Sequence, residues 1–116
     1  MKLALVVTTE GNAFEIDTST DEAAQLEEHA GGMVESILLR NDLIMWCNEV
    51  GRLRELPSNK MATIAWEMFR GKSGYIAGNV IFTGGVDISG ELESLDASRL
   101  ELLRGILALS ELGELV

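Results

Sequence analysis

The sequence contains a single cysteine (Cys47), a single histidine (His29) and a single proline (Pro57). One cysteine cannot form a disulfide within the chain, and this Cys/His content is too small for a zinc site, which takes about four ligands. A nucleophilic thiol also needs a nearby base, and His29 lies on a separate predicted helix. We therefore interpret Cys47 as a small buried hydrophobe and predict no catalytic cysteine, no metal and no cofactor.

Basic residues are missing from the segment between Leu3 and Leu39, which carries eight acidic residues, and the net charge of the chain is −10. This charge disfavours direct binding to nucleic acid, whose phosphates are also negative. It is expected to keep the protein soluble. The alternative is that the acidic surface imitates DNA and inhibits a DNA-binding enzyme.

Long hydrophobic runs are missing too. The first run, Leu3 to Val7, is too short for a secretory signal or a membrane helix. Together with the lone cysteine, this predicts a protein of the reducing cytosol without membrane contact.

At 116 residues, with 47% apolar and 24% charged residues, the chain predicts one folded domain. Apolar and β-branched runs predict strands over 2–8, 13–17, 33–39, 43–48 and 75–85, and helical spacing predicts helices over 20–30, 60–70 and 95–109. The expected class is α+β, with a mostly antiparallel sheet, packed helices and the approximate order ββαββαβα. We assign residues 1–90 to an α+β core domain. Residues 91–116 form a leucine-rich helix packed on that core or on a partner.

Capping residues mark the predicted helix starts. Ser19 with Glu22 matches a capping box, Ser58 or Asn59 precedes the second helix, and Ser94 precedes the third. In the second helix the predicted core residues are Met61, Ala65, Met68 and Phe69.

The predicted hairpin over 33–48 turns at Arg40-Asn41-Asp42 and is largely apolar on both faces. This pattern predicts that the hairpin is central in the sheet and covered on both sides. Farther along, Gly78 inside the last strand predicts a bulge or a close approach by another segment.

The C-terminal helix carries leucines over an unusually broad arc. Leu100, Leu103 and Leu107 form one stripe, and a second lies beside it, formed by Leu102, Ile106 and Leu109. Such a helix needs a second covering surface. Either it lies deep in the fold, or the first stripe pairs with a partner or with a second copy, and a homodimer is among the expected states.

Turn-forming and cationic side chains gather between Asn48 and Lys60. The candidate ligand- or partner-binding residues are Asn48, Glu49, Arg52, Arg54, Asn59 and Lys60. We expect Gly51 at a positive φ, after which the chain runs back along the strand with Leu53 and Leu56 inward and the two arginines outward. Beside a helix N-terminus this predicts a site for a small anionic, nucleotide-like ligand. The alternative is that these charges pair with neighbouring carboxylates.

Glu49 is the best single candidate for acid–base chemistry, although a turn residue is the simpler interpretation. The acidic residues lack the spacing of an EF-hand, and the glycine-rich segment 84–90 lacks the lysine of a phosphate loop.

A specific pattern runs from the first helix to the last strand. Its positions are Gly31, Gly32, Glu35, Cys47, Asn48, Glu49, Gly51, Leu53, Leu56, Pro57, Asn59 and Gly78. Over Leu26 to Thr83 the chain resembles a family of small domains of unknown function from actinobacterial bacteriophages and bacterial conjugative elements. The resemblance implies a mobile-element origin and work in the host cytoplasm, and it supplies no known activity.

The leading expectation is a non-enzymatic phage accessory protein that binds a host or phage protein, in host takeover or counter-defence. The contact surface is expected on the acidic N-terminal half or on the leucine stripe. The alternatives are an anionic-ligand binder using Asn48 to Lys60, the DNA mimic, and an enzyme using Glu49.

Overall fold

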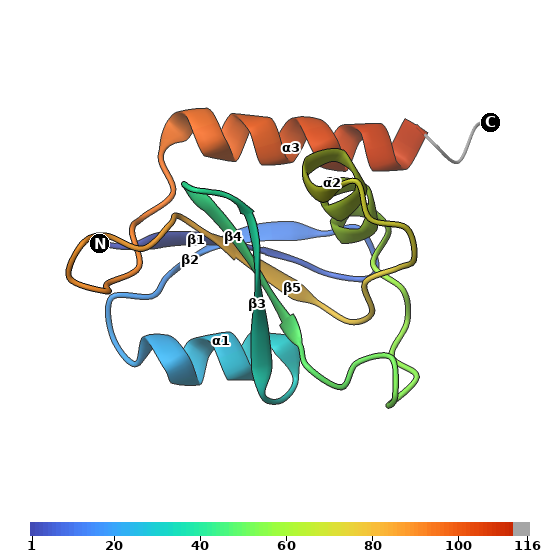
Figure 1. Ribbon diagram of the computed structural model, residues 1–116, viewed down its shortest axis with the longest axis horizontal. Coiled ribbons are helices and arrows are strands. Elements are labelled where there is room, and N and C mark those ends of the chain that lie inside the picture. Colours follow the sequence, from blue (N-terminus) through green and yellow to red (C-terminus); the bar gives the residue numbers. More distant parts are fainter. Residues whose placement is uncertain (113–116) are drawn as a thin grey trace.

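The computed structural model describes residues 1–112. Its elements are β1 (Leu3–Val7), β2 (Ala13–Asp17), α1 (Glu22–Ala30), β3 (Val34–Arg40), β4 (Leu43–Asn48), α2 (Lys60–Arg70), β5 (Val80–Thr83) and α3 (Ala97–Leu112). The strands form a sheet in the order β2-β1-β5-β4-β3, and every neighbouring pair is antiparallel. The predicted α+β class and the order ββαββαβα are confirmed (Figure 1).

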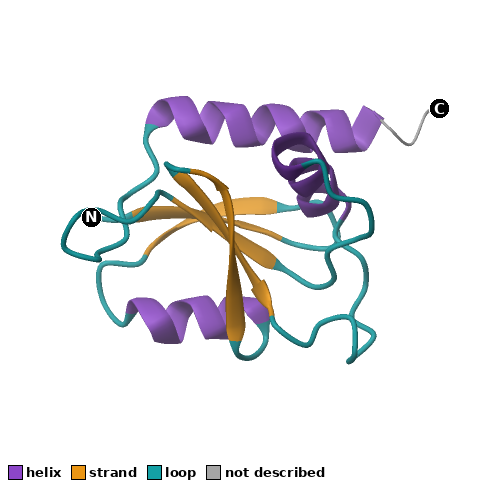
Figure 2. Cartoon of the chain, in the orientation of Figure 1, coloured by secondary structure: helices purple, strands orange, loops and turns teal. Residues whose placement is uncertain are grey.

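Helices cover both faces of the sheet, with α1 on one face and α2 and α3 on the other (Figure 1, Figure 2). Alternation along β1 divides the core between the two faces. Leu5 and Val7 belong to the cluster beneath α2 and α3, whereas Ala4 and Val6 belong to the cluster beneath α1. A strand buried on both faces needs apolar residues at consecutive positions, which explains the uninterrupted run in β1.

The β3–β4 hairpin forms as predicted, but it is not central in the sheet. β5 pairs with both β1 and β4, so β4 is internal and β3 is an edge strand. Leu38 in β3 is accordingly 48% exposed, whereas all of β4 except Trp46 is buried. The prediction of a hairpin covered on both sides is therefore wrong for β3, because the strand that shields β4 comes from the distant segment Val80–Thr83.

The helix starts test the predicted caps. Asn59 is the N-cap of α2, and its side chain accepts a hydrogen bond from the Ala62 amide. The capping box at Ser19 is wrong. α1 begins after Asp21, which has a left-handed backbone and makes no side-chain cap bond, while Ser19 donates instead to the Asp17 carboxylate.

Ser94 is not a cap either. Its hydroxyl accepts a hydrogen bond from the Leu3 amide at 2.9 Å, which ties the chain before α3 to β1. α3 begins at Ala97, and Asp96 accepts from the Arg99 amide at its start.

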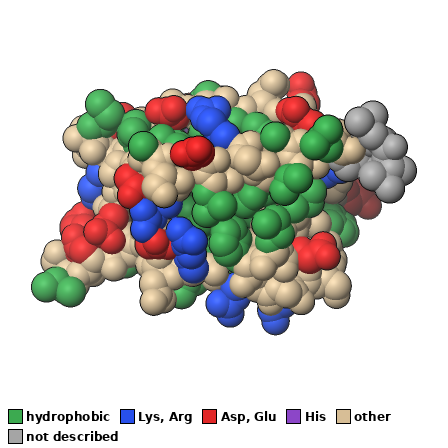
Figure 3. All heavy atoms as spheres, turned by 90° about the horizontal axis from the view of Figure 1, so that it is seen from above, with side chains coloured by type: hydrophobic (Ala, Val, Ile, Leu, Met, Phe, Trp, Pro, Cys, Tyr) green, Lys and Arg blue, Asp and Glu red, His purple; other side chains and the backbone are tan. Residues whose placement is uncertain are grey.

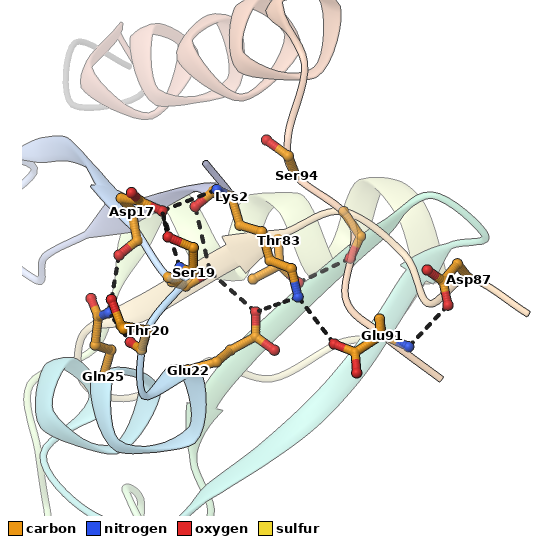
Figure 4. A network of polar contacts seen from close by, with 12 residues as sticks. Lys2, Asp17, Ser19, Thr20, Glu22, Gln25, Thr83, Asp87, Glu91 and Ser94 are labelled. Atoms are coloured by element: carbon orange, nitrogen blue, oxygen red, sulfur yellow. Dashed lines mark hydrogen bonds and ion pairs between the residues drawn. The ribbon is translucent and has the colours of Figure 1, made fainter. Parts of the chain in front are cut away.

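Lys2 joins three segments at one end of the sheet (Figure 4). Its ammonium lies 3.2 Å from Glu91 and 3.7 Å from Glu22, and its amide donates to Asp17. The Ser19 hydroxyl and then the Lys2 amide hydrogen-bond to the Asp17 carboxylate and lower its pKa to about 2. These contacts hold the loop before α3 and the turn before α1 against β1.

α3 packs its first leucine stripe into the core. Leu103 is fully buried, and Leu100 and Leu107 are half-buried against the same cluster. The first stripe therefore faces the interior of the fold, with Leu103 at its centre. The last part of the predicted segment 91–116, residues 113–116, lies outside the described residues.

Met68 is predicted in the core but is 56% exposed. Met68 lies on the same side of α2 as Met61 and Ala65 but about one turn farther along, where it lines an open groove beside α3. An exposed apolar surface therefore remains beside α3.

Candidate functional site

The loop between β4 and α2 is a series of turns and does not run back along β4. Leu53 is 85% exposed, so its predicted inward position is wrong, whereas Leu56 is half-buried and touches the position of Gly78. Gly78 has a φ of 90° and a Cβ there would lie 3.0 Å from Leu56, which confirms the predicted close approach.

Gly51 is needed for a different reason from the one predicted. The positive φ in this loop belongs to Glu55, at 56°. A Cβ on Gly51 would lie 2.8 Å from the Ala77 carbonyl oxygen, so the constraint is the close passage of two backbones. Gly51 thus fixes how the loop packs on the segment before β5.

Asn59 is fully buried and holds three segments together, β1, α2 and the segment before β5. Its side-chain amide donates to the carbonyl oxygens of Val7 and Gly78, both at 3.0 Å, while its Oδ1 accepts from the Ala62 amide. Its own backbone amide donates to Ile76 at 2.7 Å. All the side-chain polar atoms of Asn59 are engaged within the chain, which assigns it to the fold's framework.

Asn48 and Arg54 fasten the same loop to the C-terminal end of α1. Asn48 Nδ2 donates to Ala30 O at 3.1 Å and its Oδ1 accepts from the Val50 amide. Arg54 Nη1 donates to Gly31 O at 2.9 Å. A cation and an amide donor at a helix C-terminus satisfy carbonyls that have no partner within the helix.

A cavity of about 140 Å³ opens beside the loop. Its lining includes Glu35, Cys47, Glu49, Arg52, Trp66 and Tyr75. The Arg52 guanidinium lies over the Tyr75 ring, 4.8 Å from its centroid, and this cation–π contact holds it at the rim. Ligand sites for drug-sized molecules begin at about 300 Å³, so this space suits a group of only a few atoms.

The charges around the cavity do not favour an anion. Glu35 and Glu49 both line it, against the single guanidinium of Arg52. Lys60 begins α2 and lines a separate hollow with Thr8 and Glu10, so the structure does not bring it to Arg52. The six predicted loop residues therefore do not converge on one site.

Cys47 is poorly suited to nucleophilic chemistry. Burial, followed by the nearby Glu35 carboxylate, raises the pKa of the thiol to about 12. Its Sγ lies 3.8 Å from Glu35 Oε1 and donates a weak hydrogen bond to it. The thiol is therefore protonated at neutral pH, in line with its interpretation as a buried hydrophobe.

The described residues, 1–112, contain no cluster of three or more acidic, histidine or cysteine side chains that could hold a metal ion. Among the helices of this part of the chain, none has the length and hydrophobicity to cross a membrane. Every buried side-chain nitrogen or oxygen in this range has a hydrogen-bond partner.

An apolar groove between α2 and α3 is the feature that sequence reasoning missed. Met68, Leu102, Gly105, Ile106 and Leu109 line it, with Ser98 and Glu101 at its edge. It is open to solvent and encloses about 470 Å³, and hydrophobic side chains gather on this face of the molecule (Figure 3). The second predicted stripe, Leu102, Ile106 and Leu109, is the sequence signal that belongs to it.

Comparison with known proteins places the chain in a family. Neither the search of curated proteins nor the search of solved structures found a match. A family model described as a domain of unknown function, DUF3846, matches residues 1–106, which is a wider span than the Leu26 to Thr83 pattern. The match covers all five strands, α1, α2 and most of α3. The chain belongs to the DUF3846 family of domains of unknown function.

Proposed function

We propose that this protein is a non-enzymatic accessory protein of bacteriophages and related mobile elements that acts by binding another protein in the host cytoplasm. The observation that carries the proposal is the apolar groove between α2 and α3. Met68 and Leu109 each leave about half of their surface in water there, at 56% and 51% exposure. Burying the exposed half of such a side chain contributes about 1 kcal/mol, so a protein partner on this groove would gain affinity from each.

The shape of the groove favours a helical partner. It runs along the exposed flank of α3 beside α2, where a further helix can pack against two existing ones. Its lining carries a single charged residue, Glu101, at the edge. A largely apolar strip with one charged residue has the composition of an interface centre.

The loop residues support this proposal by what they already do. Asn48, Arg54 and Asn59 use their polar groups to fix the fold. Arg52 packs on Tyr75 above a cavity that also carries two carboxylates. A nucleotide-like anion would find one cation and little space there, so the groove is the better-supported binding surface.

Capture from host lysate tests the proposal. The tagged full chain is mixed with lysate of host cells that also express an untagged copy of the chain. It is expected to retain a protein from this lysate, either a host protein or the untagged copy, and Leu109→Glu is expected to lose it. Leu53→Glu is the matched control, because it places the same charge on a leucine that is 85% exposed and does not line the groove. Equal capture by Leu109→Glu, with its circular dichroism unchanged, would contradict the proposal.

A further inference from the structure

We infer that the groove binds a second copy of this chain, with the two α3 helices antiparallel and crossing at Gly105. The inference rests on the proposed function in one respect, that the groove is a protein-binding surface. It adds the identity of the partner and the geometry of the contact.

Gly105 is the first observation. It lies in the middle of α3, a helix of 16 residues, and is exposed. Glycine inside a helix lowers the folding equilibrium about fivefold relative to alanine. Nothing in the described residues, 1–112, requires it, because a Cβ added at Gly105 would have no heavy atom within 4 Å outside the backbone of its own helix. A glycine at such a position permits another backbone to approach closely, and the open groove around it shows where that backbone would come from.

The second observation is the spacing of the strip around Gly105. Alternating steps of four and three residues connect its members, Ser98, Leu102, Gly105, Leu109 and Leu112. Such a repeat averages 3.5 residues, which is the contact line of two helices packed side by side. Leu109 and Leu112 are both more than half exposed, so their side chains remain available on this line.

The strip is complementary to itself when reversed. Leu102 precedes Gly105 by three residues and Leu109 follows it by four. In an antiparallel pair crossing at Gly105, Ser98 of one copy lies beside Leu112 of the other, and Leu109 lies beside Glu101 and the adjoining Leu102. Each leucine meets an apolar or small neighbour, which is the requirement of a two-fold interface.

Charge and sheet edges also favour a second copy. All five members of the strip are uncharged, although the chain carries a net charge of −10, and Glu101 is the single carboxylate in the lining of the groove. A basic partner would therefore find little charge to complement there. Association through a sheet edge is less favourable. Glu15 and Asp17 lie on the β2 edge, and an irregular register between Leu38 and Arg40 interrupts the β3 edge.

Sedimentation equilibrium of the purified full chain tests the inference. The wild type is expected at twice 12.6 kDa. Gly105→Ala is expected to weaken the dimer at least ~10-fold, because two added methyl groups meet at the crossing, and to raise the melting temperature of the monomer by about 3–6 °C. Leu109→Glu is expected to weaken the dimer ~100-fold or more, and Leu53→Glu to leave it unchanged.

Salt separates a second copy from a basic partner. Raising the salt concentration from about 0.05 M to about 0.5 M should strengthen a dimer of two acidic chains, because it screens their repulsion. A complex with a basic protein would weaken under the same change.

Two results would overturn the inference. One is a wild-type particle of 12.6 kDa at concentrations up to ~1 mM. The other is a Gly105→Ala dimer as tight as the wild type, which would place the crossing elsewhere. If the wild type is monomeric but Leu109→Glu loses a captured host protein, the inference fails and the proposed function stands. If Leu109→Glu matches the wild type in both experiments, both fail.

Discussion

Replacing Asn59 with alanine removes three buried side-chain hydrogen bonds at once. The N-cap bond to the Ala62 amide contributes about 1 kcal/mol. The carbonyl oxygens of Val7 and Gly78 each lose a donor within a fully buried site, which costs about 1 kcal/mol or more apiece. The sum, about 3–4 kcal/mol, is a large part of the 5–15 kcal/mol that stabilises a domain of this kind.

Urea unfolding at pH 7, followed by far-ultraviolet circular dichroism, measures this loss. The midpoint for Asn59→Ala is expected to fall by about 2 M urea. Asn59→Asp keeps the cap acceptor but lacks both donors and directs a carboxylate at two carbonyls, so it is expected to be at least as unstable. Asn41→Ala, in the exposed β3–β4 turn, is the control and should change stability by less than about 0.5 kcal/mol. A loss of under about 1 kcal/mol for Asn59→Ala would refute the framework role.

Three further results are expected. The Cys47 thiol, with its pKa raised to about 12, should resist alkylation by iodoacetamide in the folded protein at pH 8 and react once urea unfolds the protein. The free energy of unfolding should also fall as the pH rises above 9.0, because the thiol ionises there in the unfolded chain. The pKa of Asp17 is lowered from 3.8 to about 2, so its contribution to the free energy of unfolding is complete above pH 3.8 and is lost towards pH 2. The difference in urea midpoint between the wild type and Asp17→Asn should therefore shrink as the pH falls through that interval. A thermal-shift screen with nucleotides should give no stabilisation, and a shift abolished by Arg52→Ala would instead restore the anionic-ligand alternative.

Two leucines of α3 differ in whether their replacement can test association. Leu103 is fully buried on the core side of α3, so Leu103→Asp should unfold the protein and cannot report on a partner. Leu109 lies on the open flank of the same helix, and its replacement by glutamate should leave the circular dichroism spectrum unchanged.

Local signals in the sequence predicted the element order well. The apolar run of β1, the glycine after α1 and the Asn59 cap each depend on residues close to one another in the chain. The two predicted caps that do not form have different causes. A long-range hydrogen bond engages Ser94, and a local one engages Ser19. Ser94 bonds to Leu3, 91 residues away, and Ser19 bonds to Asp17 before the helix begins.

Strand order and surface position could not be predicted in the same way. β3 and β4 are both apolar enough for the sheet interior, and the insertion of β5 between β1 and β4 alone decides which of them is the edge. Leu53 fits an inward position by spacing, but the turns of the loop leave it in solvent. For α3, the sequence indicates two leucine stripes, but packing buries Leu103 of the first and Ile106 of the second, and it leaves Leu109 half in solvent.

Cross-linking between two copies is the most direct measurement of the central claim. A Ser98→Cys chain is mixed with a Leu112→Cys chain and treated with a short bis-maleimide; the native Cys47 thiol can remain, because burial keeps it unreactive. The antiparallel crossing at Gly105 predicts a cross-linked pair in the mixture and little in either chain alone. Equal cross-linking within the Ser98→Cys chain alone, or none at concentrations up to ~1 mM, would contradict it.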